Sequence, residues 1–149
     1  FTPIPISLQT LFTLLSGMVL GSKNGAISQL LYIFLGAIGL PVFSGFRGGL
    51  GVLFGPTGGF LIGFVIAAYV IGKFTENSKK TNLLFYFIVG LLGTFIIYLA
   101  GISYLSLTTQ IGIRESIVVG IIPFLFGDIL KIIVASIIAF RLKFVAVIK

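Results

Sequence analysis

Long apolar runs, separated by short breaks that contain glycine, proline or lysine, dominate the pattern of this 149-residue chain. Five such segments cover residues 6–20, 25–40, 58–72 and 83–101, and a longer stretch between Arg114 and Arg141 that Pro123 interrupts. Uncharged runs of about 15–20 residues match the roughly 30 Å hydrocarbon core of a bilayer. Backbone amides in lipid must be paired within their own segment, so each run predicts a helix. We therefore predict an all-α integral membrane protein, a compact bundle of transmembrane helices.

The composition excludes most soluble and catalytic classes. Only 9% of the residues are charged, whereas a soluble domain has about 25%. The net charge of +7 comes from cations at the ends of apolar runs, which favours an anionic membrane surface over nucleic acid as partner. The chain has no Cys or His and three acidic residues, and it lacks a P-loop lysine motif. We therefore expect neither an enzyme nor a metal or cofactor site.

The cations also predict an orientation. If the five spans alternate, two cations fall on one side, Arg47 and Arg114. The other side holds Lys23, Lys73, Lys79, Lys80, Arg141, Lys143 and Lys149. The positive-inside rule makes the second side cytoplasmic, so the C-terminus lies inside and Phe1 outside. A visible start on the outer side predicts a preceding span, and thus six helices in a single membrane domain of which residues 1–149 show five.

Two connections on the outer side are unusually apolar. Residues 41–59 read PVFSGFRGGLGVLFGPTGG, and residues 102–112 read ISYLSLTTQIG. A simple solvated connector would be more polar, although this alternative stays open for the first. Apolar, glycine-rich backbone too short to span favours a segment that folds over the helices or lines a cavity. Together the two segments are expected to form a lid. A repeat of small residues on the third segment, at Gly59, Gly63 and Ala67, predicts close packing against another helix.

An acidic and a basic residue lie inside the last apolar segment. Asp128 and Lys131 are three residues apart, so both lie on one helix face, which Phe124 and Ala135 continue. Ionised groups at that depth cost about 2.5–3.5 kcal/mol each and normally face a protein interior. One interpretation is a self-satisfied pair that holds helices together. The other, which we favour, is the polar wall of an outward-facing pocket.

Five further polar residues are candidates for the same pocket. Gln9 lies in the outer half of the first segment, where its amide needs a partner. That partner is either a ligand or another helix. Arg47 is the lone charge of the glycine-rich loop, and it either reaches toward a carboxylate or anchors in lipid headgroups. Thr57 is a weaker candidate, as are Thr10 and Ser44.

Three motifs carry a resemblance to a known family. They are PIPISLQT at residues 3–10, LLYIFLGAIGLPVFSGFRGGLGVLFGPTGGFLIGF at 30–64 and IIPFLFGDILK at 121–131. The chain is similar over nearly its whole length to the biotin-specific S subunit of energy-coupling factor (ECF) transporters, the BioY family. The patterns GxxGLPVF…GxGxLxGPTGG and PFxxGDxxK are long enough to be specific.

The resemblance implies a fold, a ligand and partners. Family members are six-helix membrane proteins that capture biotin from outside and work with a transmembrane coupling subunit and two ABC-type ATPase subunits. The family's first helix precedes the PIPISLQT segment, so it is expected to be missing here. The GDxxK pair falls on Asp128 and Lys131. The glycine-rich lid falls on residues 39–59, in which Phe43, Thr57 and Gly58 are candidate ligand contacts.

Other functions remain as alternatives to biotin binding. An S subunit for another small vitamin is the nearest one. A small channel would need polar residues through the full depth of several helices, whereas here they cluster in the outer half. A membrane structural protein is a further alternative. A membrane-embedded transferase is disfavoured because so few carboxylates are available.

Overall fold

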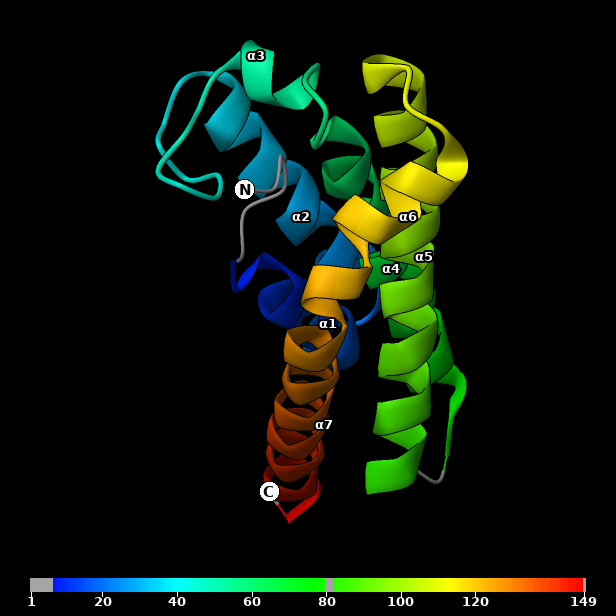
Figure 1. The fold of residues 1–149 in the computed structure, drawn as a ribbon. Helices are drawn as coiled ribbons and strands as arrows, with labels where there is room; N and C mark the ends of the chain where they lie inside the picture. Colours follow the sequence, from blue (N-terminus) through cyan, green and yellow to red (C-terminus); the bar gives the residue numbers. More distant parts are fainter. Residues whose placement is uncertain (1–6, 80–81, 149) are drawn as a thin grey trace.

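The computed structural model describes residues 7–79 and 82–148, and these form a bundle of helices (Figure 1). The elements are α1 (Gln9–Leu20), α2 (Ser22–Ala37), α3 (Leu50–Leu53), α4 (Gly58–Asn77), α5 (Leu83–Thr109), α6 (Ile113–Gly120), the short 3-10 helix η1 (Ile122–Phe124) and α7 (Leu125–Ile148). Over these residues the prediction of an all-helical fold is confirmed.

The helices differ in their ability to cross a membrane. Within the described residues, three stretches are long and apolar enough to do so: α4, α5 and Ile113–Lys143, which joins α6, η1 and most of α7. Helix α1 is apolar but has 12 residues, about 18 Å at 1.5 Å per residue. Helix α2 has 16 residues, about 24 Å. The count of five visible spans therefore remains a prediction.

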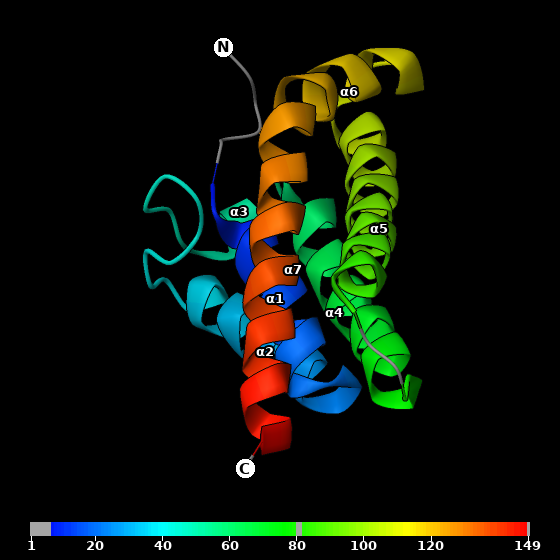
Figure 2. The same ribbon diagram turned by 90° about the horizontal axis from the view of Figure 1, so that it is seen from below.

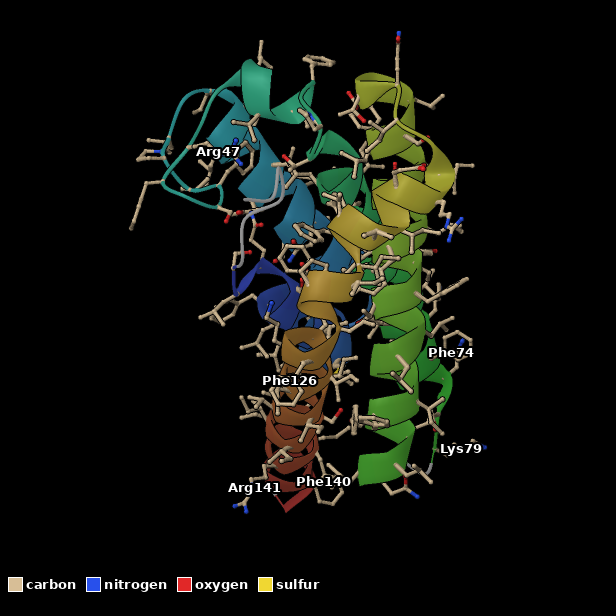
Figure 3. The ribbon with its side chains drawn as sticks, in the orientation of Figure 1. Arg47, Phe74, Lys79, Phe126, Phe140 and Arg141 are labelled. Carbon is tan, nitrogen blue, oxygen red and sulfur yellow. The ribbon has the colours of Figure 1, made fainter. Side chains whose placement is uncertain are left out.

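Large apolar side chains cover the outside of the bundle. Phe126 is 77% exposed and Phe95 is 62% exposed. Figure 3 shows Phe74 projecting from the side of the bundle, near the end of α4. A soluble protein would bury most such surface, because its exposure to water is unfavourable. An apolar exterior over long apolar helices is the structure of a membrane protein, in which lipid covers these side chains.

Small residues allow α4 and α5 to pack closely. A Cβ atom at Gly59 would lie 2.2 Å from the Cβ of Tyr104, and one at Gly63 would lie 3.0 Å from the Cα of Ile97. Ala67, the third member of the repeat, is fully buried. The predicted packing role of this stripe is confirmed, and it fixes the distance between two helices that carry cavity residues.

A tight corner joins α1 to α2 and is held by α4. Gly21 has a φ of +87°, a conformation that glycine adopts at little cost. The carboxylate of Glu76 accepts hydrogen bonds from the backbone N–H of Ser22 at 2.7 Å and from its hydroxyl at 2.9 and 3.0 Å. An acidic side chain on the first N–H groups of α2 satisfies donors that the helix leaves unpaired. Gly72 leaves room for this corner against α4.

The expectation of an outer loop at residues 102–112 is wrong, because α5 continues to Thr109. Serine and threonine hydroxyls in this region bond to carbonyl groups of the same helix: Ser103 to Leu99 at 2.7 Å and Thr108 to Tyr104 at 2.9 Å. These bonds satisfy the polar groups without a break in the helix. The helix ends at Gln110, which has a left-handed φ of 57°. Only the three residues before α6 are left as a connection.

The last apolar segment is bent near Pro123. Figure 2 shows α6 lying across the ends of α5 and α7, so that the chain turns before it enters α7. Proline has no backbone N–H and clashes with a preceding helical turn, which explains the break between α6 and α7. The break places Asp128 in the first turn of α7.

Charged residues separate between the two ends of the bundle. Figure 3 shows Arg47 at the end that carries α3, and Lys79 and Arg141 at the opposite end. The start of α5 and the end of α7 both lie at that opposite end (Figure 1). This separation is the one that the charge pattern along the chain predicts.

Candidate functional site

A cavity of about 60 Å³ lies where the start of α1, the loop of residues 38–57, α4, α5 and the start of α7 meet. Six of the seven residues predicted for the site line it: Gln9, Phe43, Arg47, Thr57, Asp128 and Lys131. The segments that contribute them are far apart in the sequence, so the helix packing described above assembles the site.

Asp128 and Lys131 form the polar floor of this cavity. The Nζ of Lys131 donates to the Oδ1 of Asp128 at 3.2 Å, and Asp128 is 5% exposed. The two residues thus bond to each other and also face a cavity.

Tyr98 on α5 is a site residue that the sequence did not single out. Its hydroxyl donates to Asp128 Oδ2, and its side chain lines the cavity. With Lys131 on the other oxygen, both carboxylate oxygens of Asp128 have a partner. A tyrosine inside an otherwise apolar span could have indicated such a site residue, because a buried hydroxyl needs a hydrogen-bond partner. The bond from Tyr98 fixes the carboxylate of Asp128 in one orientation toward the cavity.

Gln9 lies in the first turn of α1 and also lines the cavity. Its Oε1 accepts from the hydroxyl of Ser7 at 3.0 Å, and its Nε2 donates to the hydroxyl of Tyr32 on α2. Of the two interpretations made from the sequence, a bond to another helix is confirmed. The amide also lines the cavity, so a ligand contact stays a prediction.

The glycine-rich loop folds back onto the bundle at Phe43. This ring is 3% exposed and lies edge-on to the ring of Tyr32, with 5.6 Å between centroids. A Cβ atom at Gly36 would lie 2.1 Å from it, so only glycine leaves space for the ring on α2. The backbones of Phe43 and Arg47 pair with each other across a tight turn. The loop therefore lines the cavity, as predicted, and is not a solvated connector.

Arg47 is exposed at the mouth of the cavity. Its Nε donates to the carbonyl oxygen of Ser44 at 3.1 Å, which leaves its remaining N–H groups available. The hydroxyl of Ser44 is buried and, within the described part of the chain, has no hydrogen-bond partner. Ser44 also lines the cavity, so its hydroxyl is a further group that a bound molecule can satisfy.

Gly58 differs from the other predicted site residues, because it does not line the cavity. It is buried at the first turn of α4, and a Cβ atom there would lie 1.8 Å from the carbonyl oxygen of Leu53. Its role in the structure is to let α3 pack against the start of α4. The motif PTGG therefore combines one residue that faces the cavity, Thr57, with one that allows packing.

Apolar side chains form the rest of the wall. They are Val52, Phe60, Leu61, Phe64, Ile97 and Phe124. Such a site can hold a small molecule with an apolar middle and polar ends. Sites for such ligands usually measure about 300–1,000 Å³, so the cavity of about 60 Å³ must widen when a ligand enters.

Comparisons with known proteins agree on one family. The BioY family model matches residues 1–146. A biotin transporter BioY of Thermotoga maritima is 46% identical over 95% of this chain and 82% of its own length. A probable biotin transporter BioY of Pyrococcus horikoshii is 40% identical over the same shares. The solved S-component for biotin from an ECF-type ABC transporter superposes with a TM-score of 0.88, at 33% identity, over 96% of this chain and 77% of that one.

Proposed function

Because the chain belongs to the BioY family, we propose that it is the biotin-binding S subunit of an ECF-type vitamin uptake transporter. It is a membrane protein and not an enzyme, since its relatives are transporters. The single observation that carries the assignment of the site is the cavity beneath the glycine-rich loop, with the bonded Asp128–Lys131 pair as its floor.

The chemistry of biotin suits this cavity. Biotin has a ureido ring with two N–H donors and one carbonyl, a thiophane ring, an aliphatic chain and a carboxylate. Asp128 accepts from the N–H groups, or Lys131 donates to an oxygen of the ligand, and the two serve one end of it. The phenylalanine-rich wall holds the thiophane ring and the chain. Arg47 and the Ser44 hydroxyl supply donors from the loop.

The loop of residues 38–57 is the part of the wall that moves to admit biotin. Gly39, Gly45 and Gly49 have φ values of +112°, +76° and +99°, so the loop passes through conformations open mainly to glycine. The remaining walls belong to helices that pack through small residues and have little freedom to separate. Closure of the loop over biotin then removes the ligand from water, which strengthens its polar contacts.

Biotin is expected to stabilise the purified protein in detergent. A ligand that binds the folded state alone, at 100 times its dissociation constant, adds about 2.7 kcal/mol. The measurement is a thermal unfolding curve with and without biotin, accompanied by equilibrium binding of radiolabelled biotin. A saturable signal with one site per chain and a higher melting temperature is the expected result.

Two other vitamins serve as controls in the same assay. Thiamine is a cation and riboflavin has a large flat ring, so neither matches an acid–base floor in a small apolar cavity. A shift with either of them, and none with biotin, would assign the chain to another vitamin. No shift with any of the three, and no binding of radiolabelled biotin, would contradict a role as a binding subunit.

The partners in the transporter follow from the same assignment. The solved neighbour is described as part of an ECF-type ABC transporter. We propose that a transmembrane coupling subunit and two ABC-type ATPase subunits drive this chain, since it has no nucleotide-binding motif of its own. Biotin is carried as ligand, and the subunit contains no resident cofactor in this proposal.

The proposed orientation places the C-terminus in the cytoplasm and the glycine-rich loop outside. The chain has no cysteine, so single-cysteine variants report one position each. In intact cells, a membrane-impermeant maleimide is expected to label Phe46→Cys, because Phe46 is 89% exposed on the loop. It is expected to label Lys79→Cys only after the membrane is permeabilised. The reverse pattern would show that the topology is inverted.

A further inference from the structure

The aromatic hydroxyl of Tyr32 lies behind the wall of the cavity and contacts two parts of that wall. Tyr32 does not line the cavity itself. Its hydroxyl donates to the backbone carbonyl of Val42 at 2.9 Å, at the position before Phe43 in the loop. It also accepts from the side-chain amide of Gln9 on α1. One hydroxyl on α2 thus connects the first turn of α1 to the glycine-rich loop.

These bonds fix the direction of the Gln9 amide. A tyrosine hydroxyl has one proton, and the Val42 carbonyl can only accept, so the proton of Tyr32 is committed to Val42. The group that faces the Tyr32 oxygen must therefore be a donor, which is the NH₂ of Gln9. The carbonyl end of the amide points to the other side, where the Ser7 hydroxyl donates to it at 3.0 Å. One N–H of Gln9 is then left for a molecule in the cavity.

The same residues separate the cavity from a second space. A groove of about 700 Å³ between α1, α2 and α7 is lined by Tyr32 and Val42, and it shares Ser7, Gln9 and Ser44 with the cavity. These shared residues are the partition between the two spaces. If the Gln9 amide turned away from Tyr32, or if residues 42–44 moved off α2, the small cavity would open into the groove.

We propose that Tyr32 is a positioning residue of the biotin site: its hydroxyl holds Gln9 as a hydrogen-bond donor toward the ligand and keeps the loop closed over it. The proposal rests on the proposed function. It assigns to biotin an acceptor atom, the ureido carbonyl or the carboxylate, opposite Gln9. It also makes the lifetime of the bound state depend on a residue that does not touch the ligand.

The test is the dissociation rate of radiolabelled biotin from the purified protein. Tyr32→Phe keeps the ring that packs edge-on against Phe43 and removes the oxygen that serves both Gln9 and Val42. Loss of these two bonds is expected to raise the dissociation rate about tenfold. If Tyr32 acts partly through Gln9, some of the effect of Tyr32→Phe is already lost in Gln9→Ala. The dissociation rate of the double variant should then rise by less than the product of the two single increases.

Tyr104→Phe is the matched control. Tyr104 also donates to a loop carbonyl, that of Phe54 at 3.2 Å, but it bonds to no cavity residue among those described. Its loss is expected to change the dissociation rate by less than about twofold. Without biotin, the melting temperature should fall less in Tyr104→Phe, which loses one hydrogen bond, than in Tyr32→Phe, which loses two.

Three outcomes would overturn the proposal. An unchanged dissociation rate in Tyr32→Phe would do so, even if its melting temperature fell, because a merely structural role has that signature. Equal acceleration in Tyr104→Phe would show a general loosening of the loop. Multiplicative effects of the Tyr32 and Gln9 substitutions would show that the two act separately. Failure of the wild-type protein to bind biotin would instead contradict the proposed function itself.

Discussion

Replacement of Asp128 by asparagine is expected to remove high-affinity biotin binding. The substitution keeps the shape of the side chain and an oxygen that can accept from Tyr98, but it removes the charge and leaves Lys131 without its counter-ion. Loss of one partner of a buried charge pair costs about 2–4 kcal/mol, or roughly 30- to 1,000-fold in the dissociation constant. Equilibrium binding of radiolabelled biotin to the purified variant measures this change directly.

A matched control separates the local effect from a general change of charge. Glu115→Gln makes the same acid-to-amide change at an exposed position on α6 that does not line the cavity. It should leave the dissociation constant unchanged. Lys131→Met should weaken binding in the same way as Asp128→Asn. If both floor variants fold and bind biotin like the wild type, the site lies elsewhere.

Gly72→Ala is expected to have a large effect on folding. A Cβ atom there would lie 2.1 Å from the backbone nitrogen of Ser22 and 2.3 Å from the backbone carbon of Gly21. Backbone atoms cannot rotate aside like a side chain, so the whole corner between α1 and α2 must shift. Overpacking typically costs about 1–3 kcal/mol and occasionally more. The shift would also disturb the bonds from Ser22 to Glu76. Thermal unfolding in detergent should show a clearly lower melting temperature.

Gly127→Ala provides the comparison for this prediction. At Gly127, which also lies within a helix, an added Cβ meets no described atom within 4 Å outside the local backbone. Alanine favours helix by about 1 kcal/mol over glycine, so the melting temperature should stay the same or rise. Gly72 does not line the cavity, so the folded fraction of Gly72→Ala should bind biotin with an unchanged dissociation constant. Equal melting temperatures of the two variants would contradict the prediction.

The apolar pattern predicted the helices but misjudged some of their limits. In residues 102–112, serines and threonines interrupt the apolar residues, and this pattern predicts a connection between helices. The structure extends α5 through them, because hydroxyls bond within their own helix and leave the backbone regular. Conversely, the apolar stretch before α7 contains a bend, and Pro123 is the sequence feature that indicates it. Hydropathy indicates whether a segment lies in lipid or in water. Where its helix ends depends on local hydrogen bonds.

The charged residues of the site could be predicted from the sequence, but its tyrosines could not. Asp128 and Lys131 are conspicuous in an apolar span, and the structure places them beside a cavity. Tyr98 and Tyr32 were not singled out, since aromatic residues are common along the chain and their role depends on which helix each hydroxyl meets. Gly58 was included in the predicted site because it belongs to the motif PTGG, but its role is in packing. Contacts between distant helices are set by the fold, which no local pattern contains.

The bonded floor of the cavity also has an electrical consequence. A membrane potential acts on net charge, at about 2.3 kcal/mol per elementary charge for each 100 mV. Asp128 and Lys131 carry opposite charges 3.2 Å apart, so together they present almost none for the voltage to act on. The carboxylate of biotin adds a single negative charge, which an inside-negative cell repels unless a cation such as Arg47 travels with it. Accumulation of the vitamin therefore gains nothing from the voltage at this floor.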